Sequence, residues 1–145
     1  MAVAARSVAV VGAWLMAGTV CLAQETGPAG NLAGQWSGEA MFRLTSGDVR
    51  QEHTFVFEPS TDRFVAGEHS WTIPDRSLRS NDGGGDTFEA KEPFLGVVDG
   101  EEIWLVEHGD LTMFRLRLTD PDTIEFLALE GGPNALVGFG TLTRD

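Results

Sequence analysis

The feature that most constrains the fold of this chain is an alternation of apolar and polar side chains that begins at Trp36. From there, every second residue is apolar or small: Trp36, Gly38, Ala40, Phe42 and Leu44. Neighbouring side chains on a strand point to opposite faces, so the alternation predicts a half-buried strand over residues 32–44. Small residues beside a large aromatic suit the inner wall of a tightly curved sheet, where another backbone approaches closely.

The same alternation returns in short segments along the rest of the chain. Further strands are expected over 49–58, 63–68, 70–73, 87–91, 94–99, 102–108, 111–118, 123–129 and 136–143. Turn signals such as Asp99-Gly100 separate them, and no segment shows helical periodicity of useful length. About eight to ten antiparallel strands in sequence order predict an all-β fold. We expect an up-and-down β-barrel, which leaves no exposed sheet edge, with a two-sheet β-sandwich as the alternative.

Two neighbouring segments also predict their pairing register. Matching the apolar faces of 111–118 and 123–129 places Leu116 opposite Phe126 on the inside. The same register sets Arg117 opposite Glu125 on the outside, where the pair supports the sheet and does not form a site.

Residues 1–23 have the pattern of a secretory signal peptide. A basic start precedes an almost wholly apolar run over 8–22, and the small residue Ala23 ends the segment. The run is short for a membrane span of about 20 residues, so a retained anchor is the less favoured alternative. A lipoprotein acylated at Cys21 is another, although Val20 is bulkier than the residue usual before such a cysteine. We expect cleavage after Ala23, export to the periplasm or extracellular space, and no membrane insertion afterwards.

The chain after residue 23 divides into a short lead-in and one domain. Residues 24–31 contain glycine and proline and are expected to form a flexible lead-in, while 32–145 form a single domain, because the length suits one core. Without residues 1–23 the chain has no cysteine. This excludes disulfides, thiol catalysis and thiolate metal ligands.

The charge of the chain is strongly negative. Ten Lys and Arg against 22 Asp and Glu give a formal net charge of −12. Arg6 is the only charged residue before Ala23, so removal of 1–23 leaves 9 − 22 = −13. Proteins bind phosphates and anionic lipids through clustered basic side chains. Because this chain is strongly acidic, nucleic acid is not an expected partner. Solubility outside the cell explains this charge better than an acidic binding face does.

Both ends of the predicted domain resemble known barrel families. Leu32-x-Gly34-x-Trp36 is similar to the first-strand Gly-x-Trp of lipocalins and the Leu-x-Gly-x-Trp of avidins. The closing segment 136–144, Leu-Val-Gly-Phe-Gly-Thr-Leu-Thr-Arg, resembles the last strand of avidin-type barrels. The acidic residue that avidins use against biotin late in that strand has no counterpart, since Gly140 stands there. The resemblance implies a calycin-type barrel and no particular ligand.

The last third of the chain also resembles a loose group of small exported bacterial proteins without assigned function. The similar segment is Gly96-Val97-Val98-x-Gly100-x-x-Ile103-x-Leu105-Val106, followed by an aspartate-rich turn and a terminal Leu-Thr-Arg. This resemblance likewise implies a barrel and no chemistry.

Aromatic side chains on the expected inner faces are the candidate ligand-binding residues. With one inner histidine, the predicted set is Trp36, Phe42, His53, Phe55, Trp71, Trp104 and Phe114. Phe64, Phe94 and Phe126 extend the same lining. An eight-stranded barrel is wide enough either to be filled by side chains or to hold one small ligand. Nine Phe in so short a chain favour filling, with an apolar cavity as the alternative.

Each of the three histidines follows a glutamate, at Glu52-His53, Glu68-His69 and Glu107-His108. Adjacent strand residues face opposite ways, so no such pair serves one inner site, and no metal site is predicted. His69 and His108 are expected at solvated strand ends. His53 shares the inner face with Phe55 and Phe57 and is expected to be a core histidine with a hydrogen-bonded partner.

No cofactor and no catalytic residue is predicted. The loop over 75–86 ends in Asn81-Asp-Gly-Gly-Gly-Asp86, which combines carboxylates with glycine but fits no EF-hand spacing. No Gly-x-Ser-x-Gly motif occurs, and the adjacent Glu101 and Glu102 cannot flank a substrate as glycosidase carboxylates do.

Three functions stay open at this point. The leading hypothesis is a secreted, non-enzymatic barrel that binds a small hydrophobic molecule or a partner surface. The second is a barrel enzyme that uses His53 with a nearby carboxylate as acid and base. The third is a structural or interaction protein of the periplasm with a filled core. The sequence specifies neither the ligand nor the oligomeric state.

Overall fold

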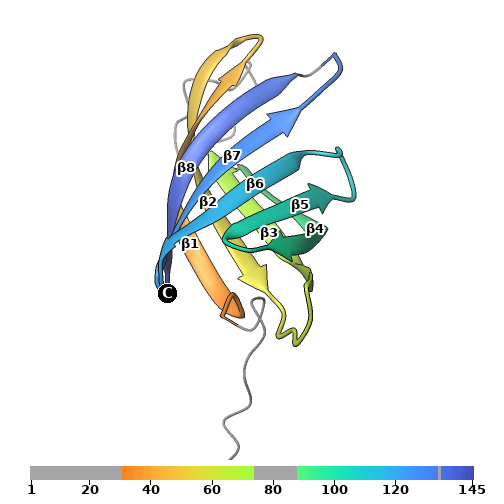
Figure 1. Cartoon of the computed structure of the whole chain (residues 1–145). Helices are drawn as coiled ribbons and strands as arrows, with labels where there is room; N and C mark the ends of the chain where they lie inside the picture. The colour runs from red at the N-terminus through yellow and green to blue at the C-terminus, as the bar shows by residue number, and fades with distance from the viewer. Residues whose placement is uncertain (1–30, 74–87, 134) are drawn as a thin grey trace, which may run out of the picture.

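The computed structural model describes residues 31–73, 88–133 and 135–145, which form one closed antiparallel barrel (Figure 1). Its strands are β1 (Gly34–Leu44), β2 (Gly47–Phe57), β3 (Phe64–Ile73), β4 (Phe88–Asp99), β5 (Glu102–Glu107), β6 (Met113–Asp120), β7 (Thr123–Glu130) and β8 (Leu136–Arg144). Each strand pairs with the next, and β1 pairs with β8 to close the sheet. The up-and-down barrel is confirmed, and the sandwich alternative is wrong.

Two parts of the sequence analysis fall outside the described residues. These are the predicted signal peptide over 1–23, with nearly all of the lead-in, and the predicted loop over 75–86. In the described ranges, no helix has the length and apolar character needed to cross a membrane.

The barrel has eight strands, at the lower end of the expected number, because two predicted pairs are continuous. Segments 63–68 and 70–73 join in β3, and segments 87–91 and 94–99 join in β4. Pro93 does not interrupt β4. Its carbonyl accepts a hydrogen bond from the N–H of His108, just past the end of β5 (3.2 Å). In an antiparallel strand, the N and O atoms of one residue point to the same neighbouring strand. The missing N–H of Pro93 therefore points toward β5, which is short, and the pairing of β4 with β3 loses no hydrogen bond.

The predicted register of β6 and β7 is confirmed. Leu116 pairs with Phe126 inside the barrel, and Arg117 pairs with Glu125 outside. In β1 the predicted inner face is also confirmed, since Trp36, Ala40 and Phe42 are buried.

Large apolar side chains fill most of the interior. The buried core consists of Leu32, Trp36, Ala40, Phe42, Val49, Phe55, Phe57, Val65, Phe94, Val98, Ile103, Leu105, Phe114, Leu116, Ile124, Phe126, Ala128 and Leu142. Gly38 shows how closely β1 and β8 approach, because a Cβ there would lie 1.9 Å from the carbonyl oxygen of Thr141. The absence of a side chain at this position is therefore a requirement of closure.

Arg144, at the end of β8, closes one end of the barrel. Its guanidinium lies 4.1 Å from the centroid of the Trp36 ring. It donates hydrogen bonds to the carbonyl oxygen of Ala33 (3.0 Å) and to the carboxylate of Asp122 (3.1 Å). The buried Trp36 in turn donates its indole N–H to the carbonyl of Leu32 (2.8 Å). Together these contacts seal the end of the barrel where β1 begins and β8 ends.

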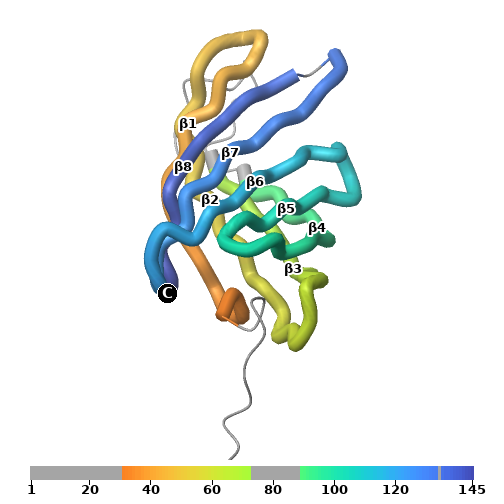
Figure 2. The backbone as a smooth tube through the Cα atoms, in the orientation of Figure 1, coloured from red at the N-terminus to blue at the C-terminus, as the bar shows by residue number. Residues whose placement is uncertain are grey.

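The opposite end, which we call the open end, carries the turns that join β1 to β2, β5 to β6 and β7 to β8. Figure 2 shows the β1–β2 and β7–β8 turns together at the top of the view, beyond the shorter strand β5. The buried polar side chains among the described residues are His53, His69, Glu107 and Thr112. All four lie toward the open end, so the buried polar side chains gather at one end of an otherwise apolar interior.

Candidate functional site

The candidate site is a chain of hydrogen bonds inside the open end, formed by residues from three strands. His53 lies on β2, His69 on β3 and Glu107 at the end of β5. Each is 2% exposed. They face inward because each strand alternates: His53 continues the phase of Phe55, His69 that of Val65, and Glu107 that of Ile103 and Leu105.

The three side chains contact one another in line. Nδ1 of His53 lies 2.8 Å from Nε2 of His69, and Nδ1 of His69 is hydrogen-bonded to Oε1 of Glu107. The other nitrogen of His53, Nε2, lies 3.1 Å from Oε1 of Gln51. The two imidazole rings differ in plane by only 9°, with centroids 5.0 Å apart, so they meet almost edge to edge. We call this series, from Gln51 to Glu107, the polar chain.

The number of donors and acceptors on each side chain fixes the direction in which hydrogen bonds are donated along the polar chain. A neutral imidazole donates through one nitrogen and accepts through the other. The Gln51 oxygen only accepts, so His53 donates to it from Nε2 and accepts at Nδ1. His69 then donates from Nε2 and accepts at Nδ1, and the donor left for that nitrogen is a protonated Glu107 carboxyl. The geometry therefore fits two neutral histidines and a neutral glutamic acid.

The electrostatics agree with this neutral arrangement. Burial, with the nearby carboxylates of Asp110 and Glu92, raises the pKa of Glu107 to about 9. Burial lowers the pKa of His53 to about 4. Burial and the neighbouring His53 lower the pKa of His69 well below its ordinary value. A charge on the polar chain would lose its hydration, and a negative charge on Glu107 would also be repelled by Asp110 and Glu92, so the neutral form is favoured at neutral pH.

Aromatic rings hold the two histidines in place. Phe55 stacks on His69 with centroids 4.1 Å apart, and Phe114 meets the same ring edge-on at 4.9 Å. Phe42 lies nearly parallel to His53 at 5.0 Å. Such packing fixes the ring planes, so both imidazoles stay in line with their hydrogen-bond partners.

A small cavity of about 60 Å³ opens beside the polar chain. Its lining is Phe42, Gln51, His53, His69, Trp71, Glu107, Asp110, Thr112, Phe114 and Leu136. Sites that enclose a drug-sized ligand measure about 300–1,000 Å³. This cavity can therefore admit one end of a ligand, or a few water molecules, while the rest of a larger ligand would lie over the rim.

Three carboxylates gather at the rim, where oxygens of Glu92, Glu107 and Asp110 lie within 4.8 Å of one another. Protein donors already engage two of them. Glu92 accepts from the backbone N–H of Gly109 (2.9 Å), and Asp110 accepts from the N–H and hydroxyl of Thr112 (2.9 and 2.7 Å). The cluster thus acts on Glu107 by repelling negative charge, which favours its protonated form.

The structure brings together five of the seven predicted ligand-binding residues. Phe42, His53, Trp71 and Phe114 line the cavity, and Phe55 packs directly against His69. Trp36 is fully buried but lies at the sealed end, under Arg144.

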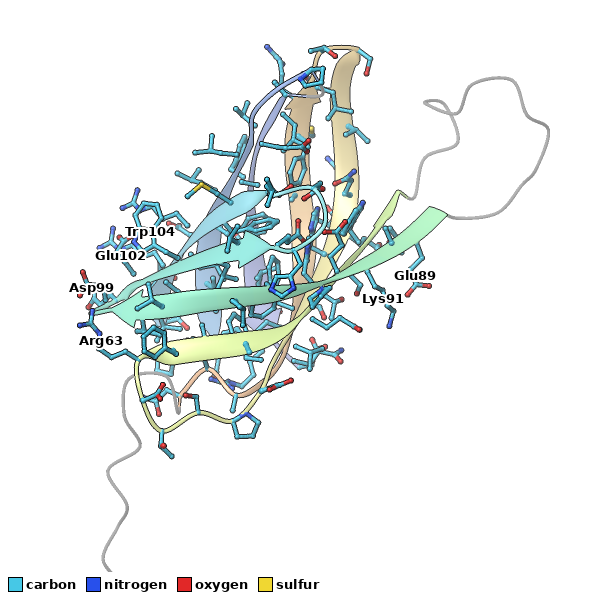
Figure 3. All side chains as sticks on the ribbon, turned by 90° about the vertical axis from the view of Figure 1, so that its right-hand side faces the viewer. Arg63, Glu89, Lys91, Asp99, Glu102 and Trp104 are labelled. Atoms are coloured by element: carbon cyan, nitrogen blue, oxygen red, sulfur yellow. The ribbon has the colours of Figure 1, made fainter. Side chains whose placement is uncertain are left out.

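The prediction that Trp104 lines the interior is wrong. Its neighbours Ile103 and Leu105 take the inner positions of β5, so Trp104 points outward and is 43% exposed. Figure 3 shows it on the outside of the barrel, near Glu102. Phe64 is also outside, 72% exposed, because Val65 holds the inner position at the start of β3.

Three residues of the polar chain, Gln51, His69 and Glu107, are not among the predicted site residues. His69 was expected at a solvated strand end, which is wrong because β3 continues through it to Ile73. Glu107 was considered only with its neighbour His108, which is exposed beyond the end of β5. Adjacent Glu and His residues do face opposite ways on their strands. However, Glu107 of the Glu107-His108 pair contacts His69 of the Glu68-His69 pair. Extending the period-two pattern of Ile103 and Leu105 by one step would have placed Glu107 inside.

The fold is similar to that of several solved structures. A redesigned β-barrel, mFAP1, bound to DFHBI, matches with a TM-score of 0.54 and 14% identity, covering 80% of this chain and 97% of that one. The S-type phycobiliprotein lyase CPES from Guillardia theta matches with a TM-score of 0.52 and 8% identity, covering 81% and 90%. A de novo designed fluorescence-activating β-barrel has a TM-score of 0.51 and 16% identity, covering 78% and 93%.

These identities are low, so the likeness concerns the barrel fold alone. No protein-family model and no curated protein matches the sequence.

Proposed function

We propose that this barrel binds a small neutral ligand at its open end, with an apolar body against Trp71 and Leu136 and one hydrogen-bonding group at the side-chain amide of Gln51. The main support is the different character of the two ends of the interior. Apolar side chains fill the sealed end, while the buried polar side chains border a cavity at the open end. Fixed polar groups among aromatic rings are typical of small-molecule sites. The same fold holds DFHBI in mFAP1, which supports a ligand site in this architecture.

The electrostatics of the site favour a neutral ligand. A cation or an anion beside the polar chain would give up its water and gain no opposite charge from the chain itself, whose imidazoles and Glu107 carboxyl are neutral. The nearby carboxylates of Glu92 and Asp110 already accept hydrogen bonds from Gly109 and Thr112. The carboxylates of Glu92 and Asp110 at the rim further disfavour an anion. With the predicted export of the chain, we propose that binding takes place outside the cytoplasm.

The test uses three probes of similar shape: neutral benzamide, anionic benzoate and cationic benzylammonium. The indole N–H signals of Trp36, Trp71 and Trp104 report separately, by NMR, on the sealed end, the cavity and the outer surface. We expect benzamide to shift the Trp71 signal saturably, and the two ions to bind at least about tenfold more weakly. That tenfold change corresponds to about 1.4 kcal/mol.

Matched variants locate the binding. Gln51→Leu removes one hydrogen-bonding group and is expected to weaken benzamide binding, while Trp104→Phe, outside the barrel, is expected to leave it unchanged. A Trp71 signal that no probe shifts, or that all three shift equally, would contradict the proposal. If benzamide binds as expected, native mass spectrometry of protein recovered from its producing cells would identify the natural ligand as a co-purifying neutral mass.

Acid–base chemistry is the second candidate, and the polar chain is the observation that favours it. A proton can pass from Glu107 to Nδ1 of His69, from Nε2 of His69 to Nδ1 of His53, and from Nε2 of His53 to a substrate. This leaves a Glu107 carboxylate and two neutral histidines with exchanged tautomers. The lowered pKa of His53, about 4, makes it a poor base at neutral pH. If the protein consumes no component of a small-molecule extract of its producing cells, while it still binds benzamide, this candidate is excluded.

A further inference from the structure

One outer face of the barrel is unusually apolar. Its large side chains, each between 38% and 62% exposed, are Leu95, Trp104, Val106, Met113, Leu127, Leu129, Val137 and Phe139. We call this set the apolar wall. Single exposed hydrophobic residues are ordinary on protein surfaces, whereas a continuous patch of this kind marks an interaction site.

The strand register shows that the wall is continuous. Leu95 pairs with Val106, Val106 with Met113, Met113 with Leu129, and Leu129 with Val137. These five side chains form one unbroken row across β4 to β8. Two residues further along the strands, Leu127 pairs with Phe139 in a second row. This row continues from Leu127 through Arg115 to Trp104, so one arginine stands within the wall. Figure 1 shows β5, β6, β7 and β8 side by side at the front of the barrel.

The size of the wall suits a stable protein interface. A half-exposed aromatic side chain presents about 100 Å², so Trp104 and Phe139 alone present on the order of 200 Å², and the six aliphatic side chains of the wall add to this area. The largest apolar patch on a typical monomer measures about 300–600 Å². One side of a standard-size interface buries about 800 Å².

The charges in and around the wall are nearly balanced, although the whole chain carries −12. Three arginines each lie beside a carboxylate, and Glu125, opposite Arg117, adds one further negative charge. Arg115 pairs with Glu102 (2.8 Å), and Arg43 pairs with Asp48 (2.8 Å). Arg117 lies 3.9 Å from Glu101. A basic partner would be drawn to the acidic faces elsewhere on the barrel. This face is instead the one where two equally acidic chains can approach with little repulsion.

The shape of the wall is also self-complementary. Leu127 and Phe139 form a ridge between two shallow hollows of about 410 and 380 Å³. A projecting ring beside a hollow on the same surface is what a two-fold contact requires, since each copy fills the hollow of the other. The barrel is closed and has no free strand edge for pairing, so association must use a face.

We propose that the apolar wall is the interface of a two-fold symmetric dimer of this chain. Phe139 and Leu127 of each copy pack at its centre, beside the Arg115–Glu102 pair. The other paired arginines, Arg43 and Arg117, form its rim with their carboxylate partners. This inference does not depend on the proposed ligand site, which lies inside the barrel.

Analytical ultracentrifugation over a range of concentrations tests the dimer. The sample is the mature protein, in the form that its producing cells make. The expected mass is twice that of one chain. Phe139→Lys and Leu129→Lys place a charge in the wall and are expected to raise the dissociation constant at least about tenfold. Both changes make the chain less negative, so general charge repulsion cannot explain a loss of the dimer.

Val56→Lys is the matched control, since Val56 lies on β2, outside the wall, and is 40% exposed. It is expected to leave the dimer intact. Circular dichroism checks that each variant retains the β-sheet signal, and all the changed side chains are exposed. A monomer at every concentration, or a dimer that persists in the wall variants, overturns the proposal. Binding of monomeric protein to neutral lipid vesicles through these residues would also overturn it and assign the wall to a membrane surface.

Discussion

At the scale of single residues, Glu107 is the group whose chemistry depends most on the fold. In an unfolded chain this carboxyl would titrate near its ordinary pKa of 4.5, whereas in the barrel its pKa is about 9. Burial raises this pKa most, and repulsion by the carboxylates of Asp110 and Glu92 adds to it, against a smaller opposite effect of the hydrogen bond with Thr112. A glutamic acid that is neutral at neutral pH is therefore part of the site.

The protonation of Glu107 predicts how stability depends on pH. Between pH 4.5 and 9 the folded state holds a proton that the unfolded state has released, so the free energy of unfolding falls as pH rises through this window. Glu107→Gln can still donate to His69 but cannot ionise. We expect wild type to lose about 3 kcal/mol more than this variant between pH 6 and 8, measured by urea denaturation.

Glu58→Gln is the control for this experiment, because it removes an exposed carboxylate at the end of β2. It is expected to follow the wild-type slope. Equal slopes for wild type and Glu107→Gln would mean that Glu107 is ionised in the folded protein, with donation along the polar chain reversed.

The histidines act in the opposite sense at lower pH. The folded-state pKa of His53 lies below that of the unfolded chain, and so does that of His69. Their contribution to stability is complete above pH 6.5 and is lost as pH falls toward 4. The free energy of unfolding is thus limited by Glu107 on the alkaline side and by the two histidines on the acid side.

At the scale of elements, period-two alternation was sufficient to predict most strands and one register. Leu116 opposite Phe126 followed directly from matching apolar faces. Alternation failed at the joins within β3 and β4, where a histidine in one strand and a proline in the other resembled interruptions. His69 continues β3 because its ring finds partners inside the barrel, and Pro93 continues β4 because β5 is short. Both reasons lie in neighbouring strands and are invisible in the local sequence.

The contact between β1 and β8 gives a prediction at this scale. Gly38→Ala would place a Cβ 1.9 Å from the Thr141 carbonyl oxygen, so two strand backbones must move apart. We expect a loss of about 1–3 kcal/mol in the free energy of unfolding, as for other overpacked sites. Gly131→Ala, where a Cβ would meet nothing within 4 Å, is the control and should change stability by less than about 0.5 kcal/mol. Equal effects of both changes would contradict the close approach of β1 and β8.

At the scale of the whole molecule, stability depends on joining the first strand to the last. Arg144 contributes to this closure through the Trp36 ring, the Ala33 carbonyl and the Asp122 carboxylate. Arg144→Lys keeps the charge but loses the planar group that makes these contacts together. We expect a loss of about 1–3 kcal/mol and faster amide hydrogen exchange in β1 and β8.

Arg117→Lys is the control for Arg144→Lys, since its carboxylate partner is 3.9 Å away and both side chains are well exposed. It should change stability by less than about 0.5 kcal/mol. If Arg144→Lys behaves in the same way, closure depends on the β1–β8 pairing and the core alone.

The fold class can be predicted from the sequence alone, because side-chain alternation depends only on neighbours along one strand. The inner positions of Trp36, Phe42, His53 and Phe55 follow from the same rule. The tertiary structure decided the site, because His53, His69 and Glu107 meet only when three strands stand in one register. It also decided the outer face, since the wall is a row across five strands and the sequence separates its members. Cross-strand distance is set by closure of the barrel, and no local pattern contains it.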